Sequence, residues 1–170
     1  MVEVRIARPE DNDAIWEVLE PVFRAGETYA IDPDISQEDA TTYWTGGTHT
    51  CFVAVSDEEI LGTYYIRPNQ GGHGAHICNC GYITAPAVQG RGIATAMLEH
   101  SFKEAAQMGF YAMQYNFVLA NNIRALEIWT RYGFQEIGRI PNAFNHPSDG
   151  FIEALILHKP LRQNRSGNVT

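Results

Sequence analysis

The sequence predicts an α+β domain in which a mixed, mostly antiparallel sheet of about seven strands is flanked by about four helices. Two observations lead to this class. Several strand-like segments, two of them close enough for a hairpin, precede a long helical pattern. A single strand–helix–strand unit and further strands follow that helix. No repeat or long linker divides the chain, so residues 1–160 are expected to form one domain, with a polar, flexible tail over 161–170.

The amino-terminal part reads as a strand followed by a helix. Residues 2–7 alternate apolar and polar side chains, which is typical of a half-buried strand. Pro9 and Asp11 open a helix whose apolar residues over 14–23 recur at helical spacing and can bury one face. Pro21 lies inside this pattern and is expected to bend the helix.

A shorter helix and a hairpin come next. Ser36 and Asp39 have the spacing of a capping box, which predicts a helix over 36–44. Residues 51–55 and 60–67 are apolar runs joined by a short turn, so two antiparallel strands are expected there. The glycine-rich segment that follows them reads as a loop.

The middle of the chain reads as a strand and then the longest helix. Residues 76–84 form the strand, which small and polar residues interrupt. The helix covers roughly 90–108 and ends at Gly109. Its start is unusual, because Gly90 and Gly92 weaken a helix and no Ser, Thr, Asp or Asn immediately precedes them as a cap.

The remaining elements complete the sheet. Residues 111–119 read as a strand, and a helix follows that is capped by Asn121 or Asn122 and stopped by Gly133. Two last strands are expected over 135–140 and 150–157.

The composition narrows the possible partners and location. With 45% hydrophobic and 19% charged residues, the chain fits a soluble globular protein. A net charge of −8 argues against nucleic acid and is compatible with an amine substrate. No apolar run suits a membrane span, and the start shows no secretion signal. Three cysteines, with Cys78 and Cys80 two apart on one strand, favour a reduced, cytoplasmic location.

The bare helix start suggests a phosphate site. The first N–H groups of a helix are unpaired and carry a partial positive charge, and glycines let a phosphate approach them closely. A plain turn before a core helix is the alternative. No Gly-Lys-Ser/Thr follows, so the segment is not a nucleotide-hydrolysing P-loop. Thr95 stands where a dinucleotide fingerprint has its third glycine.

Two motifs resemble those of the GNAT superfamily of N-acetyltransferases. The signature Gln/Arg-x-x-Gly-x-Gly/Ala is present as QGRGIA at residues 89–94. An Asn-x-x-Ala pattern followed by an aromatic residue and Gly-Phe extends from Asn122 to Phe134. The resemblance spans nearly the whole chain and implies the GNAT fold, whose sheet is splayed between its two middle strands, here 76–84 and 111–118.

The resemblance also implies acetyl-CoA as the cosubstrate. Its pyrophosphate would lie on the main-chain amides of residues 89–94, and its pantetheine arm would run between the splayed strands. Transfer to an amine would be direct, in a ternary complex, without a covalent enzyme intermediate. The implied donor-binding residues are Ile83, Thr84, Gln89, Gly90, Arg91, Gly92, Ile93, Ala94, Asn122 and Trp129.

An acetyltransferase must hold its amine in the neutral form, because an amine with a pKa of about 10 is almost fully protonated at pH 7. Many relatives carry a carboxylate for this purpose on the strand before the signature, but the strand at 76–84 has none. His76 is the nearest titratable candidate, although such a histidine is more often a plain strand-end side chain. Trp129 stands where the family usually has its acid, a tyrosine, which leaves Tyr132 as a substitute or release of the thiolate with solvent help.

Asparagines are the stronger catalytic candidates. Asparagine is disfavoured in strands, yet Asn79 and Asn116 lie on the two strands that the family splays apart. The Asn79 amide would accept a hydrogen bond from the amine or orient the acetyl group; a β-bulge is the alternative reason for an asparagine there. Asn122 is either only a helix cap or, as often in the family, a contact of the pantetheine arm.

No metal is expected. His73, His76, Cys78 and Cys80 are residue types that bind zinc, but a structural zinc site normally has a turn between paired ligands, and here the two cysteines straddle Asn79 on a strand.

A narrower resemblance concerns the acceptor. Segments 68–83, 112–122 and 140–155 are similar to the branch that contains the azetidine-2-carboxylate (proline-analogue) acetyltransferases, which implies a small cyclic secondary amine or amino acid. Acetylation of a protein N-terminus or lysine, and a non-catalytic acyl-CoA-binding module, are the alternatives. A homodimer is common for this fold.

Overall fold

One sheet of seven strands organises the protein, as the sequence predicts. The computed structural model describes residues 2–88 and 90–161, and the strand order is β1-β2-β3-β4-β5-β7-β6. The strands are β1 (Glu3–Ile6), β2 (Thr50–Ser56), β3 (Glu59–Pro68), β4 (Ile77–Thr84), β5 (Ala112–Leu119), β6 (Gln135–His146) and β7 (Gly150–Pro160). The four α-helices of the described residues are α1 (Asn12–Ala25), α2 (Gln37–Thr45), α3 (Ile93–Gln107) and α4 (Ile123–Arg131). Most of the expected polar tail, residues 162–170, lies outside the described residues.

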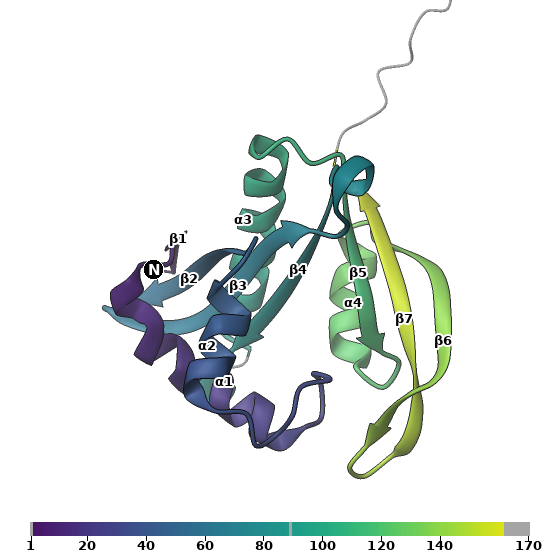
Figure 1. Cartoon of the computed structure of the whole chain (residues 1–170), viewed down its shortest axis with the longest axis horizontal. Coiled ribbons are helices and arrows are strands. Elements are labelled where there is room, and N and C mark those ends of the chain that lie inside the picture. The colour runs from purple at the N-terminus through teal and green to yellow at the C-terminus, as the bar shows by residue number, and fades with distance from the viewer. Residues whose placement is uncertain (1, 89, 162–170) are drawn as a thin grey trace, which may run out of the picture.

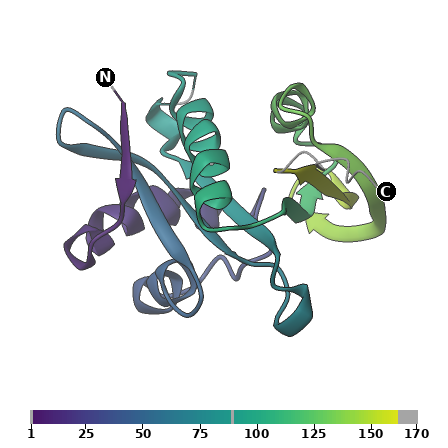
Figure 2. The ribbon, with the colours of Figure 1, turned by 90° about the horizontal axis from the view of Figure 1, so that it is seen from above.

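Helices cover both faces of the sheet. α1 and α2 lie on one face of strands β2–β4 and α3 lies on the other, as Figures 1 and 2 show. Ile15, Leu19 and Trp44 are fully buried on the α1–α2 side. Tyr64 and Met97 are fully buried on the α3 side. No helix of the described residues is long and apolar enough to cross a bilayer.

Two of the predicted local signals are confirmed. Ser36 is the N-cap of α2, and its Oγ accepts a hydrogen bond from the N–H of Asp39 at 3.1 Å. The strands β2 and β3 are joined by Asp57 and Glu58, whose φ angles of 51° and 66° are those of a tight hairpin turn.

Two element boundaries differ from the predicted ones. α3 begins at Ile93 and not near residue 90, because Gly90 and Gly92 have φ angles of 85° and 80°, which a right-handed helix does not allow. β6 continues to His146 and so passes Pro141. β6 is an edge strand with a register shift between Ile140 and Phe144, and such strands tolerate proline.

The sheet opens in its middle. The neighbouring strands β4 and β5 are parallel, and in the described residues they are in register at only two pairs, Ile77 with Ala112 and Cys78 with Met113. Beyond these pairs β4 stays on β3 and β5 stays on β7, so the two strands diverge (Figure 1). This is the splay that the resemblance implied, and it positions the site.

Candidate active site

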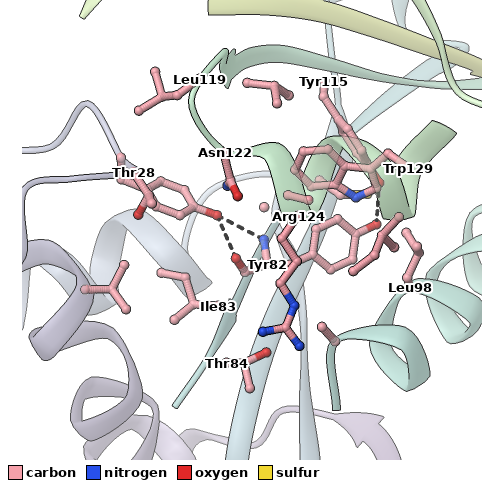
Figure 3. A pocket seen from close by; sticks show the side chains of 18 of the residues that line it. Thr28, Tyr82, Ile83, Thr84, Leu98, Tyr115, Leu119, Asn122, Arg124 and Trp129 are labelled. Atoms are coloured by element: carbon pink, nitrogen blue, oxygen red, sulfur yellow. Dashed lines mark hydrogen bonds between the residues drawn. The ribbon is translucent and has the colours of Figure 1, made fainter. Parts of the chain in front are cut away.

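A cavity of about 860 Å³ runs along the gap between β4 and β5. One wall is formed by the segment between α1 and α2, and another by the starts of α3 and α4. Figure 3 shows side chains from β4, β5 and α4 converging on it. Strand β4 runs the length of the cavity, from Asn79 at the vertex of the split to Thr84 near the glycines, which is about 17 Å at the rise of a strand.

The glycine end of the cavity is built to accept an anion. Gly92 is the N-cap of α3 and makes no side-chain capping bond. The first helical bond runs from the N–H of Ala96 to the carbonyl of Gly92 at 2.9 Å, so the N–H groups of residues 93–95 precede the helical ladder. A Cβ built on Gly92 would meet nothing within 4 Å, so space in front of these amides is open. Both the dipole and the free donors favour a phosphate here.

The start of α4 faces the same end. Asn122 is the N-cap of α4, one of the two caps that the sequence predicts, and its side chain makes no capping hydrogen bond. A contact of this side chain with the pantetheine arm stays a prediction. The side chains of Asn122 and Arg124 line the cavity and point toward β4 in Figure 3. The guanidinium of Arg124 lies 3.8 Å from the Cβ position of Gly90. Arg124 adds a positive charge at the glycine end of the cavity, and sequence reasoning missed it although it lies inside the Asn-x-x-Ala pattern.

Asn79 joins the two strands at the vertex of the split. It is 6% exposed, and its Nδ2 donates to the main-chain carbonyl of Gln114 on β5 at 2.9 Å. Its Oδ1 accepts a hydrogen bond from Nε of Arg67 at 3.3 Å. β4 is in regular register with β3 at this residue, so a β-bulge does not explain the asparagine. The Asn79 side chain instead bonds to β5 at the residue after the last register pair of β4 and β5. A catalytic role for Asn79 stays a prediction.

Asn116 lies at the same end, on the other strand. It falls in the register shift of β5 between Tyr115 and Val118. Its Nδ2 donates to Oδ1 of Asn69 at 2.6 Å, and its Oδ1 accepts from the side chain of Gln114 at 3.1 Å. The vertex is therefore surrounded by hydrogen-bonded amides, which hold it in one geometry.

A phenol from the α1–α2 segment closes part of the open edge of β4. The hydroxyl of Tyr29 accepts from the N–H of Tyr82 and donates to its carbonyl, both at 3.0 Å. The Tyr29 ring packs edge-on against Phe23 and Trp44, at 5.9 and 5.8 Å between ring centres. Burial raises the pKa of Tyr29, so its hydroxyl stays protonated and can donate. No sequence signal marked this contact, which spans 53 residues.

Two further phenols lie on the α3 side of the cavity. The hydroxyl of Tyr115 donates to that of Tyr82 at 3.1 Å. The Tyr82 hydroxyl is 2.7 Å from Oγ of Ser101, which itself donates to the carbonyl of Leu98, so Tyr82 donates to Ser101. Burial raises the pKa of both phenols, which keeps them neutral hydrogen-bond donors. The ring of Trp129 lies 5.0 Å from that of Tyr115.

Several predicted site residues lie away from the cavity. The hydroxyl of Tyr132 donates to Oε1 of Glu99 on α3 at 2.7 Å, and this bond raises the pKa of Tyr132. His76 is exposed, and its Nδ1 is 3.2 Å from the carbonyl of His73. Arg91 is exposed and is not among the lining residues. Gln89 lies outside the described residues.

The other predicted residues come together. Those that line the cavity are Asn79, Ile83, Thr84, Gly90, Gly92, Ile93, Ala94, Asn116, Asn122 and Trp129. Glu27, in the segment after α1, is the one carboxylate among the described lining residues. The described part of the chain has no group of three His, Cys, Asp or Glu side chains placed to hold a metal ion.

Comparison with known proteins gives consistent matches. The model of the acetyltransferase (GNAT) family matches residues 12–134. A GCN5-related N-acetyltransferase of known structure from Kribbella flavida is 36% identical, with a TM-score of 0.89 over 94% of this chain and 97% of that one. N-acetyltransferase aca1 from Schizosaccharomyces pombe is 28% identical over 148 residues, which are 77% of this chain and 71% of the relative. The structure of yncA from Salmonella typhimurium with its cofactor acetyl-CoA has the same fold, with a TM-score of 0.83 over 99% of both chains at 15% identity.

Proposed function

Because the chain belongs to the acetyltransferase (GNAT) family, we propose that it transfers the acetyl group of acetyl-CoA to the amine of a small molecule. The acetyl donor supplies an acyl thioester that an amine can attack. The observation that carries the proposal is the continuous cavity along the split, with an anion-binding start of α3 at one end and hydrogen-bonded amides at the other.

The donor end fits the diphosphate of acetyl-CoA. The open space in front of Gly92 lets an anion reach the free amides, and Arg124 adds a charge beside them. The edge of β4 beyond Cys78 offers main-chain groups to an extended arm in the gap, and at Tyr82 the arm would compete with the Tyr29 hydroxyl. Asn122 and Trp129 form the opposite wall.

A direct reaction is favoured over a covalent acyl-enzyme. Cys80 is the one thiol among the described lining residues, and burial raises its pKa well above the ordinary value. A protonated, buried thiol is a poor nucleophile. The amine would therefore attack the thioester in a ternary complex.

The acceptor end suits a small molecule. Its wall is made of the α1–α2 segment, including Tyr29, together with Tyr65 from β3 and Asn116 from β5. Tyr29 is tied to Tyr82, three residues along β4 from Asn79, which holds this wall against the strand. A cyclic secondary amine or an amino acid is of a size that such a site accommodates.

The test is release of coenzyme A thiol from acetyl-CoA with a panel of amines. The panel contains proline, azetidine-2-carboxylate, simple alkyl amines, and a peptide with a free N-terminus and a lysine. Turnover with a small amine at a higher kcat/KM than with the peptide supports the proposal. Turnover with the peptide alone would assign a protein acceptor. Acetyl-CoA binding without turnover on any amine would make the chain a binding module.

A further inference from the structure

We infer that Arg67 binds a carboxylate of the acceptor, so that the substrates are amines bearing a carboxylate close to the reacting nitrogen. This inference rests on the proposed function and names the substrate class for the same cavity. Arg67 lies near the end of β3, lines the cavity, and is paired in register with Asn79 on β4. Directly opposed residues of antiparallel strands share a face, so Arg67 stands beside the vertex of the split.

Arg67 is unlike the other arginines that the structure describes. Arg5, Arg24 and Arg139 each pair with a carboxylate of the protein. Apart from Arg67, the described arginines that lack such a pair are all exposed: Arg8, Arg91, Arg124 and Arg131. Within the described residues Arg67 alone is half-buried with no carboxylate at ion-pair distance. A partly desolvated guanidinium without a counter-ion is costly unless a ligand supplies one.

The contacts of Arg67 leave its binding fork free. Nε donates to Oδ1 of Asn79 at 3.3 Å, and the guanidinium carbon lies 5.9 Å from the ring centre of Tyr65. These contacts orient the group, while both terminal nitrogens have no hydrogen-bond partner among the described residues. Two parallel N–H groups held in a plane are the donor geometry that carboxylates accept in a bidentate pair.

The location of Arg67 specifies which carboxylate it takes. In the proposed function, the phosphates of acetyl-CoA bind at the Gly92 end of the cavity, next to Thr84. Thr84 lies five residues along β4 from Asn79, so Arg67, which is paired with Asn79, is at the acceptor end. The protein has a net charge of −8, which repels anionic substrates in general. A single guanidinium beside the vertex reverses this locally. An amino or imino acid would place its carboxylate on Arg67 and its amine toward the gap.

The test uses acceptor pairs that differ only in the carboxylate: proline with pyrrolidine, and azetidine-2-carboxylate with azetidine. The wild-type protein should prefer the acid of each pair in kcat/KM. Arg67→Gln should lower kcat/KM for the acids about 10- to 100-fold and leave the simple amines within about threefold. Arg67→Lys should restore part of the preference, because it keeps the charge but not the fork. Arg124→Gln is the matched control: it should raise the KM for acetyl-CoA and leave the acid-to-amine ratio unchanged.

Two results would overturn the inference. One is equal kcat/KM for acid and amine in the wild-type protein. The other is an equal loss for both in Arg67→Gln, which would mean that Arg67 only orients Asn79. If no amine supports thiol release, the proposed function fails, and thermal unfolding with N-acetylproline then decides the inference. Stabilisation of the wild type but not of Arg67→Gln would support carboxylate binding, and no stabilisation of either would reject it.

Discussion

The hydroxyl of Tyr29 bonds to both main-chain groups of Tyr82, accepting from the N–H and donating to the carbonyl at 3.0 Å each. Beyond Cys78, β4 pairs with no other described strand on the side of the gap, so these groups would otherwise have no strand partner. The phenol therefore takes the place of a missing strand at one residue. The same edge is where an acyl-CoA arm between the strands would find its hydrogen bonds, which couples the acceptor wall to the donor.

Removing this hydroxyl should separate its two effects. Tyr29→Phe keeps the ring against Phe23 and Trp44 but leaves the Tyr82 groups to water, so the free energy of unfolding should fall by about 1 kcal/mol. Acetyl-CoA should bind about fivefold more tightly, because it no longer competes with the phenol. Urea unfolding and calorimetric titration measure the two effects. Tyr43→Phe is the control, since Tyr43 lines the same cavity without bonding to Tyr82. Weaker acetyl-CoA binding in Tyr29→Phe would contradict the competition.

The start of α3 can be tested with a pair of glycines. Gly92 and Gly47 have φ angles of 80° and 63°, and a Cβ on either would meet nothing within 4 Å. Valine at either position strains the backbone by about 1–2 kcal/mol, so both variants should lose similar stability. Only Gly92→Val should lose acetyl-CoA affinity, by about tenfold or more, because its side chain would occupy the space in front of the amides. Equal affinity in the two variants, measured by calorimetry, would argue against the phosphate site.

The ion pair between Arg5 and Asp11 predicts how stability depends on pH. Asp11 is 7% exposed and accepts from both terminal nitrogens of Arg5 at 2.7 and 2.9 Å. The hydrogen bond from Arg5 lowers the pKa of Asp11 in the folded state. A lowered carboxyl pKa stabilises the fold above the unfolded value of about 4, and this contribution is lost as pH falls through the folded pKa.

Asp11→Asn should therefore lower the free energy of unfolding by about 1–3 kcal/mol at pH 7, with the difference shrinking below pH of about 4. Urea unfolding of both proteins over this range gives the comparison. Glu17→Gln, on the exposed side of α1, should change stability little at either pH. A difference for Asp11→Asn that persisted at pH of about 2 would show that packing, and not the ion pair, causes it.

The sequence predicts the parts of this site that depend on local signals. Gly90 and Gly92 mark the helix start in the sequence, because glycine adopts backbone conformations that other residues avoid. In the structure both have a positive φ. The resemblance to the GNAT family added the split between the two middle strands, which the structure shows. Asparagine is a poor strand former, so Asn79 stands out in the sequence of its strand, and the structure places it at the vertex.

The parts that the sequence does not predict depend on tertiary contacts. Three residues line the cavity from segments that carry no motif: Glu27, Tyr29 and Arg67. Hydrophobic periodicity predicts helices and strands but not which loop residues fold over a sheet. β6 is longer than the predicted strand over 135–140, because an edge strand accommodates Pro141. Tyr132 is close in helical phase to Trp129, but it follows the last helical residue and turns to Glu99.

Across the middle of the described sheet, β4 and β5 are joined by two register pairs, by the bond from the N–H of Tyr111 to the carbonyl of His76 at 2.8 Å, and by the Asn79 side chain on the carbonyl of Gln114. The sheet thus has two halves whose main chains are joined at one end of β4 and β5 and diverge toward the other (Figure 1). A molecule lying between them completes the hydrogen bonding of both inner edges. Occupancy of the gap should then slow amide exchange in β4 and β5 together, so that the bound donor acts as an eighth strand.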